Sequence, residues 1–349
     1  MKRNLRAWLV LVAFAGLTCP TQASEAPPLK LVQSIPLPGV KGRLDHFAID
    51  SKGGRLFVAA LGNNSLEVID LTACKRVRSV VGMSKPTGVL YIPAGSRTGG
   101  GLGESGPSGS ARGGEIMVAN GSDGTVKILD DTGLKVVRQL AGVGDADNLR
   151  WDQKARVAWL GYGDGALGLI DVGAAKPGAS IKLPGHPESF QLEVRGNRIF
   201  VNVPNAKEIA VIDRESRGLV SQWPMKKYQG NFPMALDEER QRLFIGCREP
   251  ARLVVLDTTE GKPVAEAAIS GDMDDLFYDA SRKRLYVSCG EGFIDCVEET
   301  SLDGYKRAAK LPTARGARTS FFSPELDRLY LAVPERDGQG AEIRVYQPY

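Results

Sequence analysis

Short apolar runs separated by charged or glycine-rich turns recur along nearly the whole chain. Two clear copies of this pattern end at Asp70 and at Asp257, and each holds an apolar run, a charged turn, Arg-Leu-Phe followed by Val or Ile, a second turn and a last apolar run. Apolar runs of four to eight residues bounded by such turns are typical of β-strands. Each copy therefore predicts three consecutive strands.

The three-strand unit occurs seven times. Four successive units end at Asp130, Asp171, Asp213 and Asp257, at spacings of 41, 42 and 44 residues. This period matches the roughly 40–45 residues of a four-stranded propeller blade. A fourth strand follows each unit except the last, and residues 29–38 resemble these fourth strands. The pattern predicts an all-β, seven-bladed β-propeller whose N-terminal strand completes the last blade and closes the ring.

One long insertion interrupts the regular spacing. Asp70 and Asp130 are 60 residues apart, and the excess lies in the Gly- and Ser-rich residues 94–113. This composition predicts a flexible loop within the second blade, on the face opposite the channel mouth. Since we find no long amphipathic helix, residues 24–349 are expected to form a single propeller domain.

The N-terminus has the pattern of a secretory signal. Lys2, Arg3 and Arg6 precede the apolar residues 7–17, and small residues follow up to Ala23. We expect cleavage near Ala23 and a periplasmic or secreted protein. A lipoprotein reading at Cys19 is less favoured because the residues before it fit poorly. No later run approaches the roughly 20 apolar residues of a membrane span.

Charge argues against nucleic acid as a partner. Residues 1–23 carry three of the positive charges and no negative ones, so their removal lowers the net charge from +4 to about +1. A nucleic-acid binder is expected to present a broad positive face. We therefore expect a small molecule or a protein as partner, and a monomer.

Four cysteines follow residue 23. They are Cys74, Cys247, Cys289 and Cys296, and the best candidates for a disulfide are Cys289 and Cys296, which flank a short Gly-Glu-Gly turn and could face each other across a hairpin. The other interpretation is four separate thiols packed as small apolar residues. Both remain open from the sequence.

The repeats resemble those of the YVTN or YncE-like β-propeller family. The resemblance rests on Pro86-Thr87-Gly88-Val89 and on the segments at residues 67–70, 242–245 and 284–287. It extends over nearly all of residues 24–349 and implies an exported seven-bladed propeller. It implies no particular activity, because propellers include enzymes, binding proteins and scaffolds.

Candidate functional residues come from the starts of the first strands, which meet at the mouth of a propeller channel. Alignment on the Arg-Leu-Phe-Val strand predicts a first ring of Asp45, Pro86, Asp147, Glu188, Phe232, Asp274 and Arg318. The second ring is His46, Thr87, Asn148, Ser189, Pro233, Asp275 and Thr319. The candidate ligand-binding residues are Asp45, His46, Asp147, Asn148, Glu188, Asp274, Asp275 and Arg318.

Four carboxylates in the first ring would repel one another, and a bound cation is one remedy. The candidate metal ligands are Asp45, Asp147, Glu188 and Asp274. Carboxylate and amide oxygens favour Ca²⁺ or Mg²⁺ over zinc. The alternative is that Asp and Asn at strand starts bond only to loop backbone. Arg318 pairs with a neighbouring carboxylate or holds an anionic ligand.

Two functions follow from these rings. The first is a non-catalytic module that binds a small molecule or protein at the channel mouth. The second is a divalent-metal-dependent hydrolase or lyase with His46 as the candidate acid or base. The loops between second and third strands open on the same face and contribute Asn120, Tyr162, Asn205, Arg248 and Glu291. No serine-hydrolase elbow, zinc-protease helix, phosphate-binding loop or dinucleotide fingerprint is present.

Overall fold

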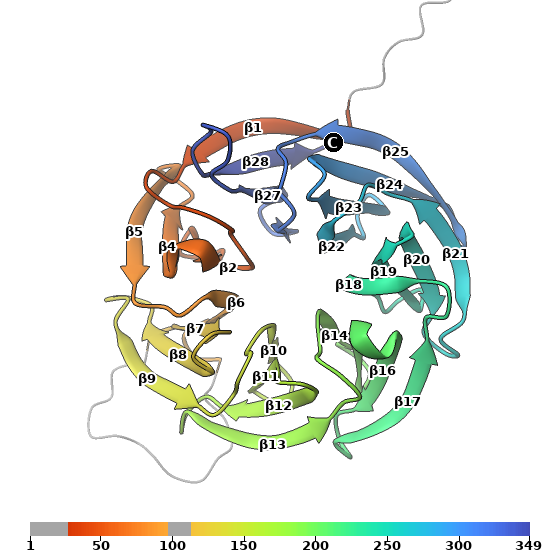
Figure 1. Cartoon of the computed structure of the whole chain (residues 1–349), viewed down its shortest axis with the longest axis horizontal. Coiled ribbons are helices and arrows are strands. Elements are labelled where there is room, and N and C mark those ends of the chain that lie inside the picture. The colour runs from red at the N-terminus through yellow and green to blue at the C-terminus, as the bar shows by residue number, and fades with distance from the viewer. Residues whose placement is uncertain (1–26, 97–112) are drawn as a thin grey trace, which may run out of the picture.

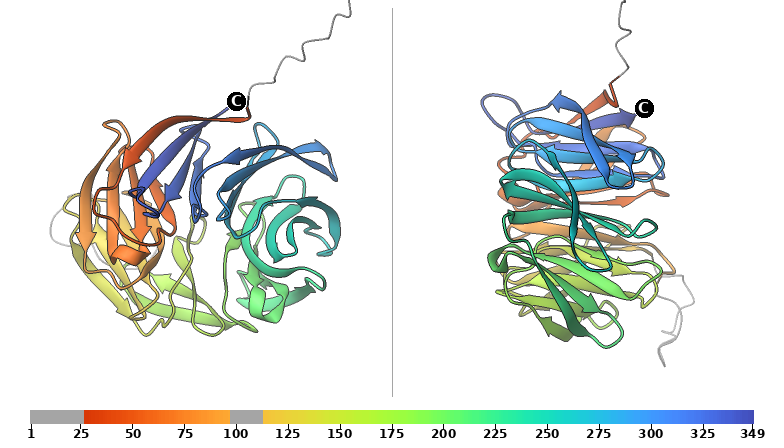
Figure 2. Two further views of the ribbon diagram at one scale, coloured as in Figure 1. Left: turned by 45° about the horizontal axis from the view of Figure 1, so that its top comes forward. Right: turned by 90° about the vertical axis from the view of Figure 1, so that its right-hand side faces the viewer.

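A computed structural model of the chain describes residues 27–96 and 113–349. Seven four-stranded antiparallel sheets stand side by side in a closed ring (Figure 1), and the views in Figure 2 show the flat disc that they form. The predicted seven-bladed β-propeller is confirmed. The predicted signal at residues 1–23 and residues 97–112 of the insertion lie outside the described residues.

Each of the first three blades uses four consecutive strands, from the innermost to the outermost. They are β2 (Phe47–Asp50), β3 (Arg55–Ala60), β4 (Ser65–Asp70), β5 (Lys75–Val81); β6 (Pro86–Ile92), β7 (Glu115–Asn120), β8 (Thr125–Asp130), β9 (Val136–Ala141); β10 (Leu149–Asp152), β11 (Val157–Tyr162), β12 (Ala166–Asp171), β13 (Lys176–Lys182). The 3₁₀ helix η1 (Leu61–Asn63) follows β3.

The next three blades repeat this order. They are β14 (Phe190–Leu192), β15 (Arg198–Val203), β16 (Glu208–Asp213), β17 (Gly218–Pro224); β18 (Gln229–Asp237), β19 (Arg242–Glu249), β20 (Ala251–Asp257), β21 (Pro263–Ala268); β22 (Met273–Asp279), β23 (Arg284–Cys289), β24 (Phe293–Ser301), β25 (Gly304–Pro312). The 3₁₀ helix η2 (Pro204–Ala206) follows β15. Within the described residues, no helix is long and apolar enough to cross a bilayer.

Blade seven joins the two ends of the described fold. It contains β26 (Ser320–Ser323), β27 (Arg328–Val333), β28 (Glu342–Pro348) and, as its outermost strand, β1 (Leu29–Pro36). β1 pairs antiparallel with β28, and the Tyr349 amide donates to the Pro28 carbonyl at 3.1 Å. The predicted closure by the N-terminal strand is confirmed.

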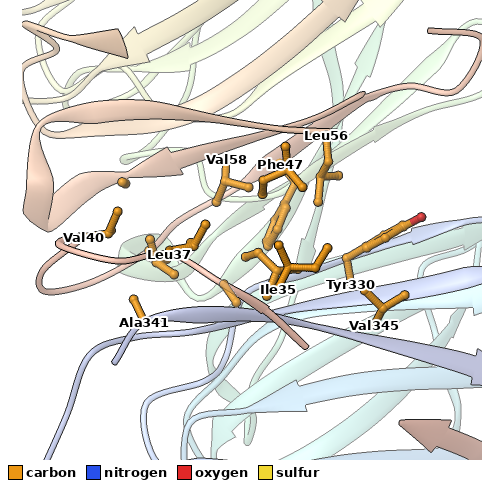
Figure 3. Packing of buried hydrophobic residues seen from close by; sticks show 14 residues of the cluster. Ile35, Leu37, Val40, Phe47, Leu56, Val58, Tyr330, Ala341 and Val345 are labelled. Atoms are coloured by element: carbon orange, nitrogen blue, oxygen red, sulfur yellow. The ribbon is translucent and has the colours of Figure 1, made fainter. Parts of the chain in front are cut away.

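Apolar side chains fill the spaces between neighbouring blades. Figure 3 shows this packing between blades one and seven, where Ile35 and Tyr330 face Phe47 and Val58. Six further buried clusters follow the ring in the same way. The continuous packing places the innermost strands firmly around the axis.

The disulfide between Cys289 and Cys296 is not formed, and all four described cysteines are free thiols. In the hairpin of β23 and β24, Cys289 pairs with Phe293 and Cys296 pairs with Tyr286. The two thiols therefore face opposite sides of the sheet, in separate apolar clusters. Of the two interpretations that the sequence left open, the structure has the separate thiols.

Candidate functional site

A cavity of about 420 Å³ lies on the propeller axis, lined by residues of all seven innermost strands. At one end it is bounded by His46, Asn148 and Asp275, which precede or begin these strands. Further along, its wall contains aromatic and aliphatic residues. The cavity thus has a polar mouth and a mostly apolar interior, as ligand pockets in proteins commonly do.

Strand pairing defines which residues share a level at the mouth. The second strand of each blade carries an Arg-Leu-Phe-Val segment or its equivalent, and the last residue of this segment pairs with one residue of the first strand. These first-strand residues are Phe47, Val89, Leu149, Phe190, Met234, Leu276 and Ser320. The residues two positions earlier form the outer ring: Asp45, Thr87, Asp147, Glu188, Phe232, Asp274 and Arg318. The residues one position earlier form the second ring: His46, Gly88, Asn148, Ser189, Pro233, Asp275 and Thr319.

The predicted register agrees with these rings in six blades and was wrong by one residue in blade two. There Thr87 and Gly88 take the positions expected for Pro86 and Thr87. The long insertion between β6 and β7 leaves no short turn from which the residues of blade two can be counted. The remaining ring members, including all eight candidate ligand-binding residues, lie at the predicted levels.

Three arginines surround the carboxylate of Asp274. Arg248 Nη2 lies 2.8 Å from Oδ1, while Arg43 Nη2 lies 3.0 Å and Arg318 Nε lies 3.2 Å from Oδ2. Arg43 also contacts Asp45 at 3.0 Å. The arginines offset the repulsion expected among the ring carboxylates.

His46 stands between two carboxylates. Its Nε2 lies 3.6 Å from Asp45 Oδ1, and its Nδ1 lies 3.5 Å from Asp275 Oδ1. Burial by itself would lower the pKa of His46, but Asp275 and then Asp45 raise it to about 10. Burial also raises the pKa of Asp45 to about 7. The imidazole is therefore protonated at neutral pH.

Asp147 and Glu188 form the less compensated side of the mouth. Burial, followed by the neighbouring carboxylate of Asp147, raises the pKa of Glu188 to about 8, and burial raises the pKa of Asp147 as well. Asn148 Nδ2 donates to Asp147 Oδ2 at 3.0 Å. The Asn148 Oδ1 atom is buried and accepts no hydrogen bond from the described residues. A polar ligand would supply that donor.

The loop residues proposed from the sequence divide into two groups. Arg248 reaches the mouth, where its guanidinium lies 3.9 Å from the centre of the Phe232 ring and contacts Asp274. Asn120 is buried and accepts from the Ser84 amide, a structural role. The others, which do not line the cavity, are Tyr162, Asn205 and Glu291.

Sequence reasoning missed Arg43 altogether and did not connect Arg248 with Asp274. Arg43 lies two residues before Asp45 and outside the repeat, so the alignment had no position for it. Its hydrogen bond to Asp274 joins segments 231 residues apart in the chain. The sequence feature that could have indicated Arg43 is its positive charge two residues before Asp45, a member of the acidic ring.

The four carboxylates suggested as metal ligands do not converge as a compact set. Within residues 27–96 and 113–349, no group of three or more His, Cys, Asp or Glu side chains is arranged to hold a metal ion. Of the suggested ligands, Asp274 contacts three arginines and Asp45 contacts one. A metal site therefore remains a prediction.

Comparisons with known proteins show the fold alone. No family model matches the chain, and no curated protein sequence matches it. A chain in the crystal structure of the mitotic checkpoint complex aligns over 99% of both chains with a TM-score of 0.73 and 14% identity. A chain of Kuenenia stuttgartiensis hydrazine synthase aligns over 88% of this chain and 98% of its own length, with a TM-score of 0.71 and 15% identity.

Proposed function

We propose that this protein is an exported binding propeller that holds a small molecule at the polar mouth of its central cavity. The observation that carries the proposal is the convergence of His46, Asn148 and Asp275 at one end of the 420 Å³ cavity, with Asp45 in contact with His46 behind them. Concave sites with a few convergent polar groups and perturbed pKa values are typical of binding sites.

The protonation of His46 argues against a role as general base and leaves the ring a hydrogen-bond donor for a ligand. A histidine acts as a general base through its neutral form, and catalytic groups have pKa values near the working pH. The pKa of about 10 keeps His46 cationic between Asp45 and Asp275. In that state it donates hydrogen bonds and does not accept a proton.

A fragment screen by protein-observed NMR tests the binding function. The expected result is that bound fragments shift resonances of the ring residues and that His46→Gln and Asp275→Asn weaken these fragments several-fold. Asp303→Asn, in the exposed turn between β24 and β25, on the face opposite the mouth, is the matched control and should bind as the parent does. Fragments that bind only on the outer strands would contradict the proposal.

Metal analysis separates the binding module from the hydrolase or lyase. Elemental analysis of the purified protein, before and after chelation, is compared for the parent, Asp147→Asn and Asp275→Asn. The binding proposal expects no stoichiometric metal in any sample. Stoichiometric Ca²⁺ or Mg²⁺ that is lost in the variants would favour the enzyme and direct a screen of lactones and esters.

Export and membership of the YVTN or YncE-like family belong to the same proposal. They are supported by the charged and then apolar start of the sequence and by the repeats themselves. The test is cell fractionation with N-terminal sequencing. Recovery from the periplasm with a new N-terminus near Ser24 is expected, and a cytoplasmic chain that retains Met1 would contradict export.

A further inference from the structure

An inner ring of the cavity contains a single charged residue. The third residue of each Arg-Leu-Phe-Val segment or its equivalent pairs with one member of this inner ring, and all seven members line the cavity. The members are Ala48, Leu90, Arg150, Gln191, Ala235, Phe277 and Phe321. Arg150 therefore places a permanent positive charge in a ring whose other six members are uncharged.

Arg150 lacks the carboxylate partners that the arginines of the mouth have. Its Nη1 donates to its neighbour's carbonyl, Leu149 O, at 2.9 Å, and its guanidinium carbon lies 5.5 Å from the centre of the Phe190 ring. Within the described part of the chain, no ion pair or side-chain hydrogen bond connects Arg150 to an acid, whereas Arg43, Arg248 and Arg318 all contact Asp274.

The Arg150 guanidinium keeps unused hydrogen-bond donors, and its burial disfavours a positive charge without a counter-ion. A guanidinium has five N–H donors, of which Arg150 uses one with the described residues. Burial lowers its pKa, while Asp275 and Asp147 raise it only through space, without contact. An anion in the cavity would accept the free donors and balance the charge.

We propose that Arg150 binds the carboxylate of a small organic acid whose apolar part lies against Phe277 and Phe321. Both rings belong to the inner ring, and their centres are 5.9 Å apart. Figure 1 places β10, which carries Arg150, across the ring from β22, which carries Phe277. A molecule across the axis therefore meets the charge at one end and the aromatic rings at the other. The inference rests on the proposed cavity-binding function.

The surrounding charges select a monoanion. The planar fork of a guanidinium matches one carboxylate in a bidentate geometry. A phosphate dianion would bring a second negative charge close to Asp275 and Asp147, which act on Arg150 through space. Asp275 and Asp147 already offset part of the positive charge of Arg150 and of the protonated His46, and this favours a single added negative charge, as in a monocarboxylate.

Calorimetry and ligand-observed NMR with benzoate, phenylacetate and 3-phenylpropanoate test this inference, with the corresponding amides as uncharged analogues. The parent protein should bind at least one acid about tenfold or more tightly than its amide, since a charge-assisted pair is lost in the amide. Arg150→Gln should remove this preference. Arg150→Lys should keep part of it, because the charge remains and the fork is lost. Arg78→Gln, on the exposed part of β5, is the control and should bind as the parent does.

The outcomes separate the two proposals. Equal binding of acids and amides, an acid preference that survives in folded Arg150→Gln, or tighter binding of inorganic phosphate than of any acid would overturn the carboxylate site. Amides that still shift the resonances of His46 and Asp275 would leave the cavity-binding function standing. A parent protein that binds none of the acids or amides would overturn the carboxylate site, and the fragment screen then decides the wider proposal. Thermal unfolding of each variant verifies that it is folded.

Discussion

Arg43 and Asp274 contact each other across the mouth of the propeller, with 3.0 Å between Nη2 and Oδ2. Arg43 precedes β2 of blade one, and Asp274 lies in β22 of blade six, so the contact passes the front of blade seven. Arg248 and Arg318 approach the same carboxylate from blades five and seven. One carboxylate thus connects four blades at the axis.

Removal of this carboxylate should destabilise the protein. Asp274→Asn removes the carboxylate that three arginines share. Arg43 keeps Asp45, and Arg248 and Arg318 keep Asp272, so we expect a loss of about 1–3 kcal/mol in the free energy of unfolding. Chemical denaturation measures it. Asp303→Asn removes an exposed partner of Arg242 and should cost less than about 1 kcal/mol. Equal effects of the two variants would show that the axial cluster adds nothing beyond a surface ion pair.

The mouth should make stability fall as the pH rises. Asp45 has a pKa of about 7 in the folded protein against 3.8 ordinarily, and Glu188 has about 8 against 4.5. His46 has about 10 against 6.5. Between the ordinary pKa of each group and its pKa in the folded protein, the folded state holds more protons than the unfolded chain. The free energy of unfolding therefore decreases as the pH rises. The stabilisation that protonated His46 provides is complete below about pH 6.5 and is lost as the pH rises past about 10.

Thermal unfolding between about pH 5 and about pH 9 measures this dependence. The midpoint should decrease across the range, and Glu188→Gln combined with His46→Gln should flatten the curve above neutrality. The charged groups that face His46 are Asp45, Asp147 and Asp275. A midpoint that increases from pH 5 to pH 9 would contradict the assigned protonation states.

Gly88 should tolerate no side chain. A Cβ atom at this position would lie 2.1 Å from the Asp147 carbonyl oxygen in the next blade. Gly88→Ala therefore forces blades two and three apart, and we expect a loss of about 1–3 kcal/mol, as in other overpacked sites. Gly144→Ala is the control, because no atom lies within 4 Å of its Cβ position. Comparable unfolding midpoints for both variants would rule out the tight contact.

The cysteines should react as buried thiols. Cys74 is half-buried, whereas Cys247, Cys289 and Cys296 are buried, and burial raises the pKa of Cys247 to about 12. Of these four, Cys74 should be modified first by a thiol reagent in the native protein, and the others after unfolding. The unfolding midpoint should be the same with and without reductant. A drop in reductant would indicate a disulfide.

The repeat pattern predicted the fold because each blade reuses the same alternation of strands and turns. A short turn between first and second strands allowed the register to be counted in six blades, and all eight candidate residues occupy the predicted levels. In blade two the insertion at residues 94–113 replaces that short turn, so the predicted register was displaced by one residue. Local pattern therefore determines register only where strands are closely connected.

The chemistry of the mouth was less predictable than its position. The partners of Asp274 come from loops and strands of three other blades, and no local pattern relates them. Arg150 was overlooked because it lies two residues beyond the second ring, and strand alternation alone does not show which side chains of the first strands line a cavity. The separation of Cys289 from Cys296 could have been predicted from the sequence. A three-residue turn after Cys289 pairs this residue with Phe293, and Cys296 then points to the opposite side of the sheet.

The pairing of β1 with β28 makes the described fold nearly continuous at its ends. Because the Tyr349 amide donates to the Pro28 carbonyl, the backbone could be joined there by a short linker. The chain could then be opened at the junction between two other blades, leaving every sheet with its four strands. In a circularly permuted protein of this kind, the inner surface would keep its residues and their spacing. The order in which the blades leave the ribosome could therefore be changed independently of the site that they surround.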